Sequence, residues 1–189
     1  IVMAVLTAFV LIEDVRVLGL NIGRTEGIDY LYFAYGSNLD LEQMAQRCPD
    51  AEIVGPVRLE NYELRFRGSG FATVAPKKGS IVHGLVWKIT PNCEQSLDRY
   101  EGYPRHYTKE TVTVKDAAGA ELPVMVYIMA EPYCRQPALP SPYYYRVIQR
   151  GFEANGLQAA WDRTVDEVFS GKLDKPRNKK SERRKELER

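Results

Sequence analysis

The chain has 189 residues and a formal net charge of +1 at pH 7, which is enough sequence for one domain with a substantial core. The charge is uneven, because residues 172–189 hold nine Lys or Arg against four Asp or Glu, which gives this tail +5 and residues 1–171 about −4. The body lacks the basic excess typical of nucleic-acid binding, so we expect no nucleic-acid partner. The tail has almost no apolar residues, so we expect it to be disordered or a frayed helix.

The number and spacing of the cysteines and histidines indicate the redox compartment of the protein and which metal sites it could form. Cys48, Cys93 and Cys134 are widely separated, odd in number and without CxxC spacing. This pattern argues against a disulfide framework and a zinc site, and it is typical of a reducing compartment, so we expect a cytoplasmic protein. His83 and His106 are the two histidines of the sequence, too few for a histidine-rich centre, and we expect no metal.

Residues 1–12, IVMAVLTAFVLI, are almost wholly apolar. The run is too short for a transmembrane helix, and it lacks the basic segment and the clear cleavage site of a signal peptide, so we expect no membrane association. Residues 1–28 are set apart as an N-terminal extension. The pattern leaves open whether this extension lies upstream of the natural start or adds an element to the domain, for which we expect residues 29–171.

The domain begins with the stretch Tyr30–Leu39, YLYFAYGSNL. An apolar, aromatic run long enough for a buried strand stops at Gly36, and polar capping residues follow at once. Asp40 with Gln43 predicts a capping box, and the helix that it starts should end near Arg47. A strand that turns through glycine into a helix start directs several backbone N–H groups at one place, which suits a carboxylate or an oxyanion.

The middle of the chain is rich in strands. Alternation and turn residues predict strands over Leu59–Phe66, Phe71–Ala75, Ile81–Ile89, Tyr107–Val114 and Leu122–Met129. The segment Pro76-Lys77-Lys78-Gly79 is typical of a hairpin loop between the second and third of these strands.

Helices are inserted between and after the strands. Thr90-Pro91 and Ser141-Pro142 each combine a capping hydroxyl with proline at the first helical position. Gly102 should end the first of these helices and Asn155-Gly156 the second, and a last helix is predicted over Leu157–Phe169. This order favours an α+β domain with a curved or barrel-like sheet over a doubly wound one.

Glu101 is the residue with the strongest chemical signal. It shares one helix face with Cys93, Leu97 and Tyr100, at spacings i, i+4, i+7 and i+8. An inward carboxylate in the last helical turn is disfavoured by burial and by the negative end of the helix dipole, and both raise its pKa. The pattern indicates a general acid/base near neutral pH, although a surface glutamate at a frayed helix end would fit the same spacing.

Ser37 and the tyrosines are the other candidates. Ser37 could act as a nucleophile with His83 or His106 as base, but its neighbours do not form a G-x-S-x-G elbow. Most of the tyrosines should pack with their hydroxyls at the boundary of the core. Tyr144 is distinguished because it follows a proline-rich loop and shares a helix face with core residues, so packing and a pocket role both remain open.

Three motifs then stand in order: YFAYGSNL over Tyr32–Leu39, LDRYEG over Leu97–Gly102, and PSPYY over Pro140–Tyr144. Together they resemble the gamma-glutamylcyclotransferase (AIG2-like) family, and further similar segments extend the match from about Tyr30 to Trp161. The resemblance implies a small mixed β-barrel with peripheral helices, often a homodimer. It also implies cyclisation of a gamma-glutamyl group to 5-oxoproline with release of the attached amine, and no cofactor.

The family's functional positions carry over onto matching residues. Glu101 matches the catalytic glutamate, and Tyr144 matches the tyrosine that follows the proline loop. The substrate-cradling loop and one added substrate contact comprise Tyr35, Gly36, Ser37, Asn38, Leu39 and Tyr107. Residues 103–106, Tyr-Pro-Arg-His, depart from the animal enzymes, and we expect this surface to touch the leaving amine.

Two alternatives to a gamma-glutamylcyclotransferase remain. One is an enzyme on the same scaffold that acts on another gamma-glutamylated compound, such as a gamma-glutamylamine or a biosynthetic intermediate. The other is a non-catalytic module that binds a carboxylate ligand in the same pocket. Glu101 argues against the second, because a carboxylate in the pocket repels an anionic ligand.

Overall fold

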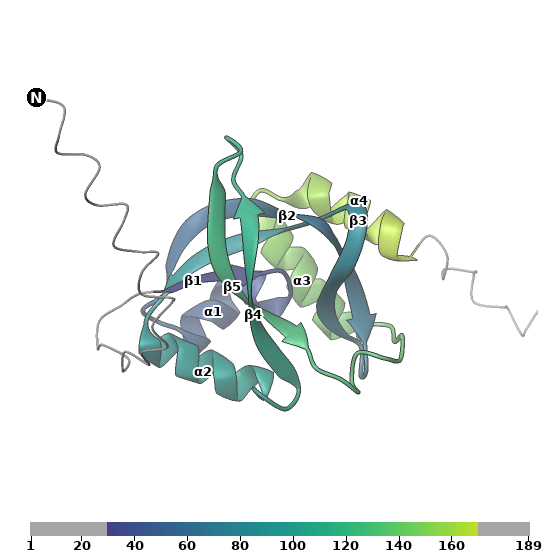
Figure 1. Ribbon diagram of the computed structural model, residues 1–189, viewed down its shortest axis with the longest axis horizontal. Coiled ribbons are helices and arrows are strands. Elements are labelled where there is room, and N and C mark those ends of the chain that lie inside the picture. The colour runs from purple at the N-terminus through teal and green to yellow at the C-terminus, as the bar shows by residue number, and fades with distance from the viewer. Residues whose placement is uncertain (1–29, 170–189) are drawn as a thin grey trace, which may run out of the picture.

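Residues 30–169 are described by a computed structural model, in which five strands close into a barrel (Figure 1). The strands follow one another around the barrel in the order β1-β3-β2-β4-β5. Their bounds are β1 Tyr30–Ala34, β2 Glu52–Arg67, β3 Phe71–Ile89, β4 Tyr107–Lys115 and β5 Glu121–Met129. Neighbours are antiparallel except for β1 and β5, which are parallel. The predicted small mixed barrel is confirmed, whereas the expected segments 1–28 and 172–189 lie outside the described residues.

β2 and β3 form the longest pair, and here the sequence prediction was wrong. The segment Pro76–Gly79 is not a hairpin loop, because it lies within β3, and the residues on both sides of it pair with β2. The register jumps between Glu60 and Tyr62, where Asn61 takes φ 62° and its side chain accepts a hydrogen bond from the Gly79 N–H at 3.1 Å. This bulge accommodates the extra residues of β3 and lets one strand bend around the barrel.

The bulge also resets which side of β2 faces inward. Before it, Val57 and Leu59 are buried, and after it Leu64 and Phe66 are buried, so the inward positions change from odd to even residue numbers. A one-residue shift in a strand exchanges its two faces. The apolar pattern of β2 therefore requires the bulge.

The helix boundaries confirm the capping signals. In α1 (Leu41–Arg47) and α2 (Pro91–Glu101), the side chains of Asp40 and Thr90 accept hydrogen bonds from backbone N–H groups of the first turn. In α3 (Pro142–Ala154), Ser141 caps in the same way, and α4 spans Gln158–Phe169. The capping box at α1 is only half formed, because the Gln43 side chain accepts a hydrogen bond from Arg47 instead of returning to the backbone.

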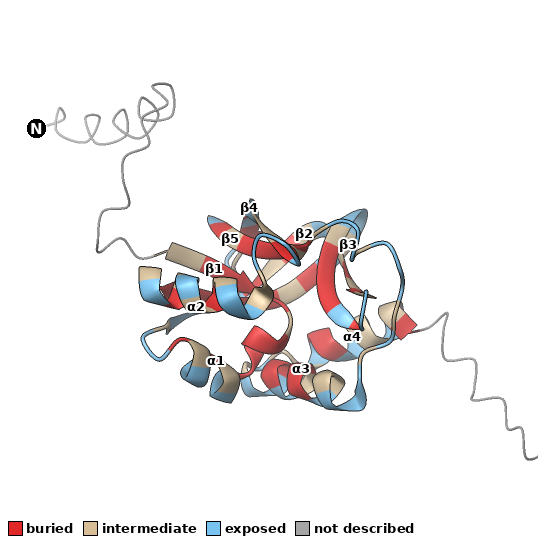
Figure 2. Cartoon of the chain, turned by 90° about the horizontal axis from the view of Figure 1, so that it is seen from below, coloured by how far each residue is buried: buried red, intermediate tan, exposed pale blue. Residues whose placement is uncertain are grey.

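The helices gather along one side of the barrel that the strands form (Figure 2). α3 turns Val147, Ile148, Gly151 and Phe152 inward, toward the segment that follows β1. A side chain at Gly151 would place its Cβ 2.6 Å from the Leu39 Cβ, so only glycine permits this close approach. Among residues 30–169, no helix is both long and apolar enough to cross a membrane.

Candidate active site

A cavity of about 330 Å³ opens where β1 ends and α2 ends, a size within the usual range of small-molecule sites. We divide its lining by exposure into a floor and a mouth. The floor consists of the buried and half-buried residues Tyr32, Tyr35, Gly36, Ser37, Asn38, Ala72, Glu101, Tyr107, Tyr127, Met129 and Tyr144. The mouth consists of the exposed residues Gly68, Ser69, Phe71, Tyr100, His106 and Tyr133.

The segment after β1 is a short 3-10 helix, Ser37–Leu39, that leads into α1. The Leu39 N–H donates to the Gly36 carbonyl at 3.0 Å, so it is already used within the turn. The N–H groups of Ser37 and Asn38 are the first two of this helix and have no acceptor inside it. The Leu39 side chain is fully buried in the core and does not line the cavity, in contrast to the expected substrate contact.

Glu101 is the last residue of α2, where its carboxyl group enters the cavity. Burial raises its pKa to about 7, although a hydrogen bond from Asn38 and the nearby Arg47 guanidinium both lower it. Gly102 then ends the helix at φ 64°, and a Cβ there would lie 2.9 Å from His106 Nδ1. The structure therefore supplies the shifted carboxyl that the helix periodicity predicts.

Tyr100, which the same periodicity places on the inward face, is not buried. It is exposed at the cavity mouth, whereas Cys93 and Leu97 are in the core. This part of the face prediction was wrong because the last turn of α2 lies beside an opening rather than against packed strands.

Asn38 connects the turn after β1 to the end of α2. Its Nδ2 donates to Glu101 Oε1 at 2.9 Å and to the Tyr32 hydroxyl at 2.8 Å, and its main-chain carbonyl accepts a hydrogen bond from Trp87 Nε1 at 3.1 Å. The bond from Nδ2 orients the Glu101 carboxyl. Asn38 also lines the cavity, so its expected role as a substrate contact stays a prediction beside this positioning role.

Arg47 is a site residue that the sequence reasoning missed. Its guanidinium donates to Asn38 Oδ1 at 2.5 Å and to the Gln43 side chain, and it stacks 3.5 Å from the centroid of the Tyr100 ring. Its last-turn position on α1 signals only a helix end in the sequence. Only the folded arrangement brings this cation close enough to Asn38 to affect Glu101.

The floor tyrosines differ in where their hydroxyl groups are directed. Tyr35 donates to the Tyr127 carbonyl at 2.5 Å, and Tyr107 donates to the Ala72 carbonyl at 2.8 Å. The Tyr144 hydroxyl instead accepts a hydrogen bond from the Ala72 N–H at 3.3 Å, so its own proton is not used in that bond. The three residues line the cavity as expected. Of these three, Tyr144 is the one whose bond to the backbone leaves its own proton to be donated, either to the neighbouring Ser37 hydroxyl or to a ligand.

The Ser37 hydroxyl lies 3.2 Å from the Tyr100 hydroxyl and 3.4 Å from an Arg47 nitrogen. His106 is exposed at the mouth, and His83 lies on β3 and does not line the cavity. The pairing of a serine nucleophile with a histidine base therefore finds no support in these contacts.

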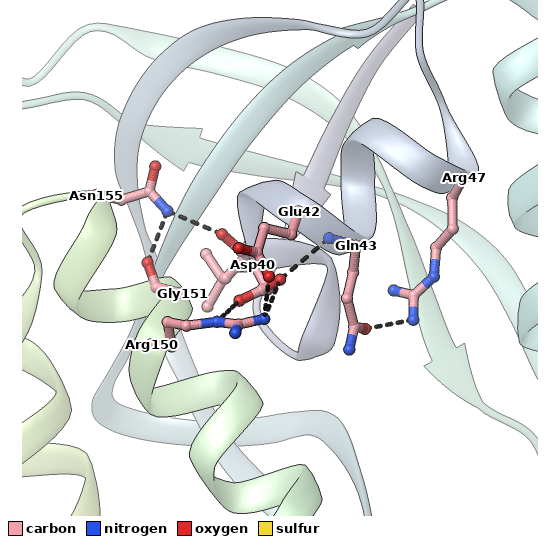
Figure 3. Close-up of polar contacts among 8 residues, drawn as sticks. Asp40, Glu42, Gln43, Arg47, Arg150, Gly151 and Asn155 are labelled. Atoms are coloured by element: carbon pink, nitrogen blue, oxygen red, sulfur yellow. Dashed lines mark hydrogen bonds and ion pairs between the residues drawn. The ribbon is translucent and has the colours of Figure 1, made fainter.

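The turn is fixed from behind by α3, as Figure 3 shows. The Arg150 guanidinium forms a two-point ion pair with the buried Asp40 carboxylate. Burial raises the pKa of Asp40, but the hydrogen bonds from Arg150 and from the Gln43 N–H outweigh burial and hold it below its ordinary value. Asn155 Nδ2 donates to the Leu39 carbonyl at 2.9 Å and to the Gly151 carbonyl of α3 at 2.7 Å, so the end of α3 holds the turn at one further backbone position.

The side chains that line the cavity suit proton transfer and hydrogen bonding rather than metal binding. Within residues 30–169 there is no group of three or more His, Cys, Asp or Glu that could hold a metal ion. Cys48 and Cys93 are buried in the core, and Cys134 is half-buried on the loop after β5. The chemistry available in the cavity is proton transfer at Glu101 and hydrogen bonding by tyrosine hydroxyls and backbone N–H groups.

A closed mixed barrel that presents one carboxyl of raised pKa beside a strand-to-helix turn defines a class of small-molecule site, and comparisons identify the family. The profile described as Gamma-glutamyl cyclotransferase, AIG2-like, matches residues 32–146. The gamma-glutamylcyclotransferase of Bos taurus is 33% identical over 163 residues, 78% of this chain and 85% of the relative. That of Homo sapiens is 32% identical over 159 residues, 76% and 83% of the two chains.

Structural comparison agrees with the sequence comparison. A solved structure named Gamma-glutamyl cyclotransferase superposes with a TM-score of 0.68 at 32% identity, covering 75% of this chain and 88% of the other. The chain belongs to the gamma-glutamyl cyclotransferase, AIG2-like family. Its curated relatives are enzymes, and the resemblance inferred from the three motifs is confirmed.

Proposed function

We propose that this protein is a cyclotransferase that converts a gamma-glutamyl compound to 5-oxoproline and releases the attached amine. The observation that carries the proposal is the Glu101 carboxyl, which has a pKa of about 7 inside a cavity of substrate size. A general acid/base works best when its pKa lies near the working pH. In a protein of this family, that carboxyl is the residue expected to move the proton.

The reaction begins with the neutral α-amino group of the substrate, whose nitrogen attacks the γ-carbonyl carbon of the same molecule and closes a five-membered ring. As the new C–N bond forms, the nitrogen gives one of its two protons to the ionised Glu101 carboxylate and keeps the other in the ring. Because the attack is intramolecular, holding the substrate folded supplies up to about 7–11 kcal/mol of the barrier reduction.

The second half of the reaction breaks the original amide bond. The ring closure places negative charge on the former carbonyl oxygen, and the N–H groups of Ser37 and Asn38 are the donors proposed to stabilise it. As that oxygen re-forms its double bond, the C–N bond to the leaving amine breaks. The protonated Glu101 returns its proton to the departing nitrogen, so the carboxylate is regenerated.

Glu101→Gln tests this assignment. The amide keeps the shape and can still accept the hydrogen bond from Asn38, but it cannot accept the substrate proton. We expect release of 5-oxoproline, measured by chromatography, to fall about 10²–10⁴-fold. Release at a near-parental rate would show that Glu101 is not the base.

Thermal unfolding provides the folding control for Glu101→Gln. The folded-state pKa of Glu101 is raised above its ordinary value, so the stability gained from its protonated form is complete below about pH 4.5 and is lost as pH rises through about 7. Glutamine removes this loss. The variant should therefore be at least as stable as the parent at pH 8, and reduced activity cannot be attributed to unfolding.

The binding-module alternative has a distinct outcome. A protein that only binds would be stabilised against heat by 5-oxoproline without turning over any member of a panel of gamma-glutamyl compounds.

A cytoplasmic location and a homodimer also belong to the proposal. The three separated cysteines support the first, and family resemblance supports the second. Sedimentation of the purified chain tests the dimer directly.

A further inference from the structure

The mouth of the cavity is unusually aromatic for a solvent-exposed surface. Phe71, Tyr100 and Tyr133 are 48%, 47% and 38% exposed, respectively, and all three line the cavity. They come from the start of β3, the last turn of α2 and the loop after β5, so three separate parts of the chain converge on one opening. Exposed aromatic groups gathered at a pocket mark a binding surface.

Each of these rings is held by a neighbour. Phe71 stands edge-on to Tyr144 with ring centroids 5.3 Å apart, and Tyr133 stands edge-on to His106 at 4.8 Å. Tyr100 is stacked on the Arg47 guanidinium, and its hydroxyl lies 3.2 Å from the Ser37 hydroxyl. A ligand that packs on these rings therefore immobilises little that was free, which favours binding.

The charge at the mouth is equally informative. Within residues 30–169, the part of the chain that the structure describes, no Lys or Arg lines the cavity, and His106 is the one basic side chain in its lining. Arg47 lies behind the Tyr100 ring and is engaged by Asn38 and Gln43. A carboxylate on the leaving amine would lose water at this mouth without gaining a fixed ion pair, and Glu101 would repel it.

We propose that the leaving group of the substrate is an aromatic amine that carries no carboxylate, bound on the rings of Phe71, Tyr100 and Tyr133. The natural substrate class would then be gamma-glutamyl amides of arylalkyl amines rather than gamma-glutamyl amino acids. This inference rests on the proposed cyclotransferase function. It concerns the group released and leaves the ring closure at Glu101 unchanged.

Four synthetic substrates separate the two parts of the proposal. Gamma-glutamyl-phenethylamide and gamma-glutamyl-ethylamide differ by the aromatic ring, and gamma-glutamyl-phenylalanine and gamma-glutamyl-alanine add a carboxylate to each. We expect the ring to raise kcat/KM for 5-oxoproline release about tenfold, from burial of its apolar surface. We expect the carboxylate to lower it by about fivefold, so the phenethylamide is the best substrate and the alanine compound the poorest.

Variants at the mouth locate the effect. Tyr133→Ala and Phe71→Leu should each lower the ratio of kcat/KM between the phenethylamide and the ethylamide to about threefold. Tyr143→Ala is the matched control, because Tyr143 is 66% exposed on α3 but does not line the cavity. Its ratio should remain that of the parent.

The outcomes distinguish this inference from the function on which it rests. If all four compounds release 5-oxoproline but the two amino acid conjugates exceed their amide counterparts, the leaving-group proposal is overturned and the cyclotransferase function stands. An unchanged ring preference in Tyr133→Ala and Phe71→Leu would also overturn it. If none of the four compounds releases 5-oxoproline, the proposed function fails, and this inference fails with it.

Discussion

The floor and the mouth of the cavity are held in place by different kinds of interaction. On the floor, polar groups are fixed by other protein groups: Asn38 holds Glu101, Arg47 holds Asn38, and the Tyr107 hydroxyl reaches the Ala72 carbonyl. At the mouth, half-exposed rings are oriented mainly by ring contacts. Geometry for a proton transfer needs the first kind of construction, whereas discrimination between leaving groups needs only a shaped apolar surface.

The contrast also explains where change is tolerated. A substitution on the floor removes one partner of a buried hydrogen bond and leaves the other unsatisfied, which costs more than the bond itself contributed. A substitution at Phe71 or Tyr133 of the mouth removes exposed ring area and orphans no buried hydrogen-bonding group. The predictions below test that contrast, beginning with the largest expected effect.

The pH dependence of turnover is the most direct test of the floor. With a Glu101 pKa of about 7, the carboxylate form is the minor one in acid, so kcat/KM should be about 30-fold lower at pH 5.5 than at pH 8. Arg47 lowers that pKa, so Arg47→Met should move the profile to higher pH. Arg99→Met, in the last turn of α2, is the charge-matched control. A profile centred near pH 4.5 would contradict the assignment.

Two floor tyrosines should differ in activity rather than in stability. Tyr144→Phe removes a hydroxyl that accepts from the Ala72 N–H and can donate to a ligand, so kcat/KM should fall about five- to tenfold and the free energy of unfolding by about 1 kcal/mol. Tyr107→Phe removes a donor to the Ala72 carbonyl, so it should lower the free energy of unfolding by a similar amount, about 1 kcal/mol, while kcat/KM changes little because the ring still lines the cavity. Steady-state kinetics and urea unfolding measure these effects, and an equal fall in kcat/KM for the two variants would refute the distinction.

The support behind the turn should show the smallest effect. Arg150→Ala leaves the buried Asp40 carboxylate with the Gln43 N–H, and because Arg150 is itself half exposed we expect only a small loss in unfolding free energy. The folded-state pKa of Asp40 is lowered, so this stabilisation is present above its ordinary pKa and is lost as pH falls below it. Arg146→Ala, an exposed arginine of the same helix, should change stability by less than about 0.5 kcal/mol. An equal loss in both variants would argue against the ion pair.

Local chemistry in the sequence predicted much of the fold. Thr90-Pro91 and Ser141-Pro142 begin helices, and Gly102 ends one, because each satisfies backbone groups within its own turn. The hairpin at Pro76–Gly79 could not be judged in this way. Its proline and glycine are typical of a turn, but pairing with β2 on both sides, through the bulge at Asn61, keeps the chain in one strand.

The site shows the same division. Helix periodicity identified Glu101 as an inward carboxylate, but the same periodicity misplaced Tyr100, since an angle around a helix does not show where the neighbouring structure ends. Arg47 was missed because its partner Asn38 meets it only through the turn between β1 and α1. Motif resemblance supplied the loop as a unit and did not separate Leu39, which packs in the core, from the residues that line the cavity.

By itself, the sequence determined the helices, their caps and the family, and it indicated Glu101 as an inward carboxyl, since these depend on neighbours along the chain or on motifs. The tertiary structure alone decided that Asn38 meets Glu101, 63 residues away, with a bond of 2.9 Å. It also decided that three distant aromatic residues form one mouth. The physical reason is that burial, pKa and shape are properties of surroundings that only closure of the barrel assembles.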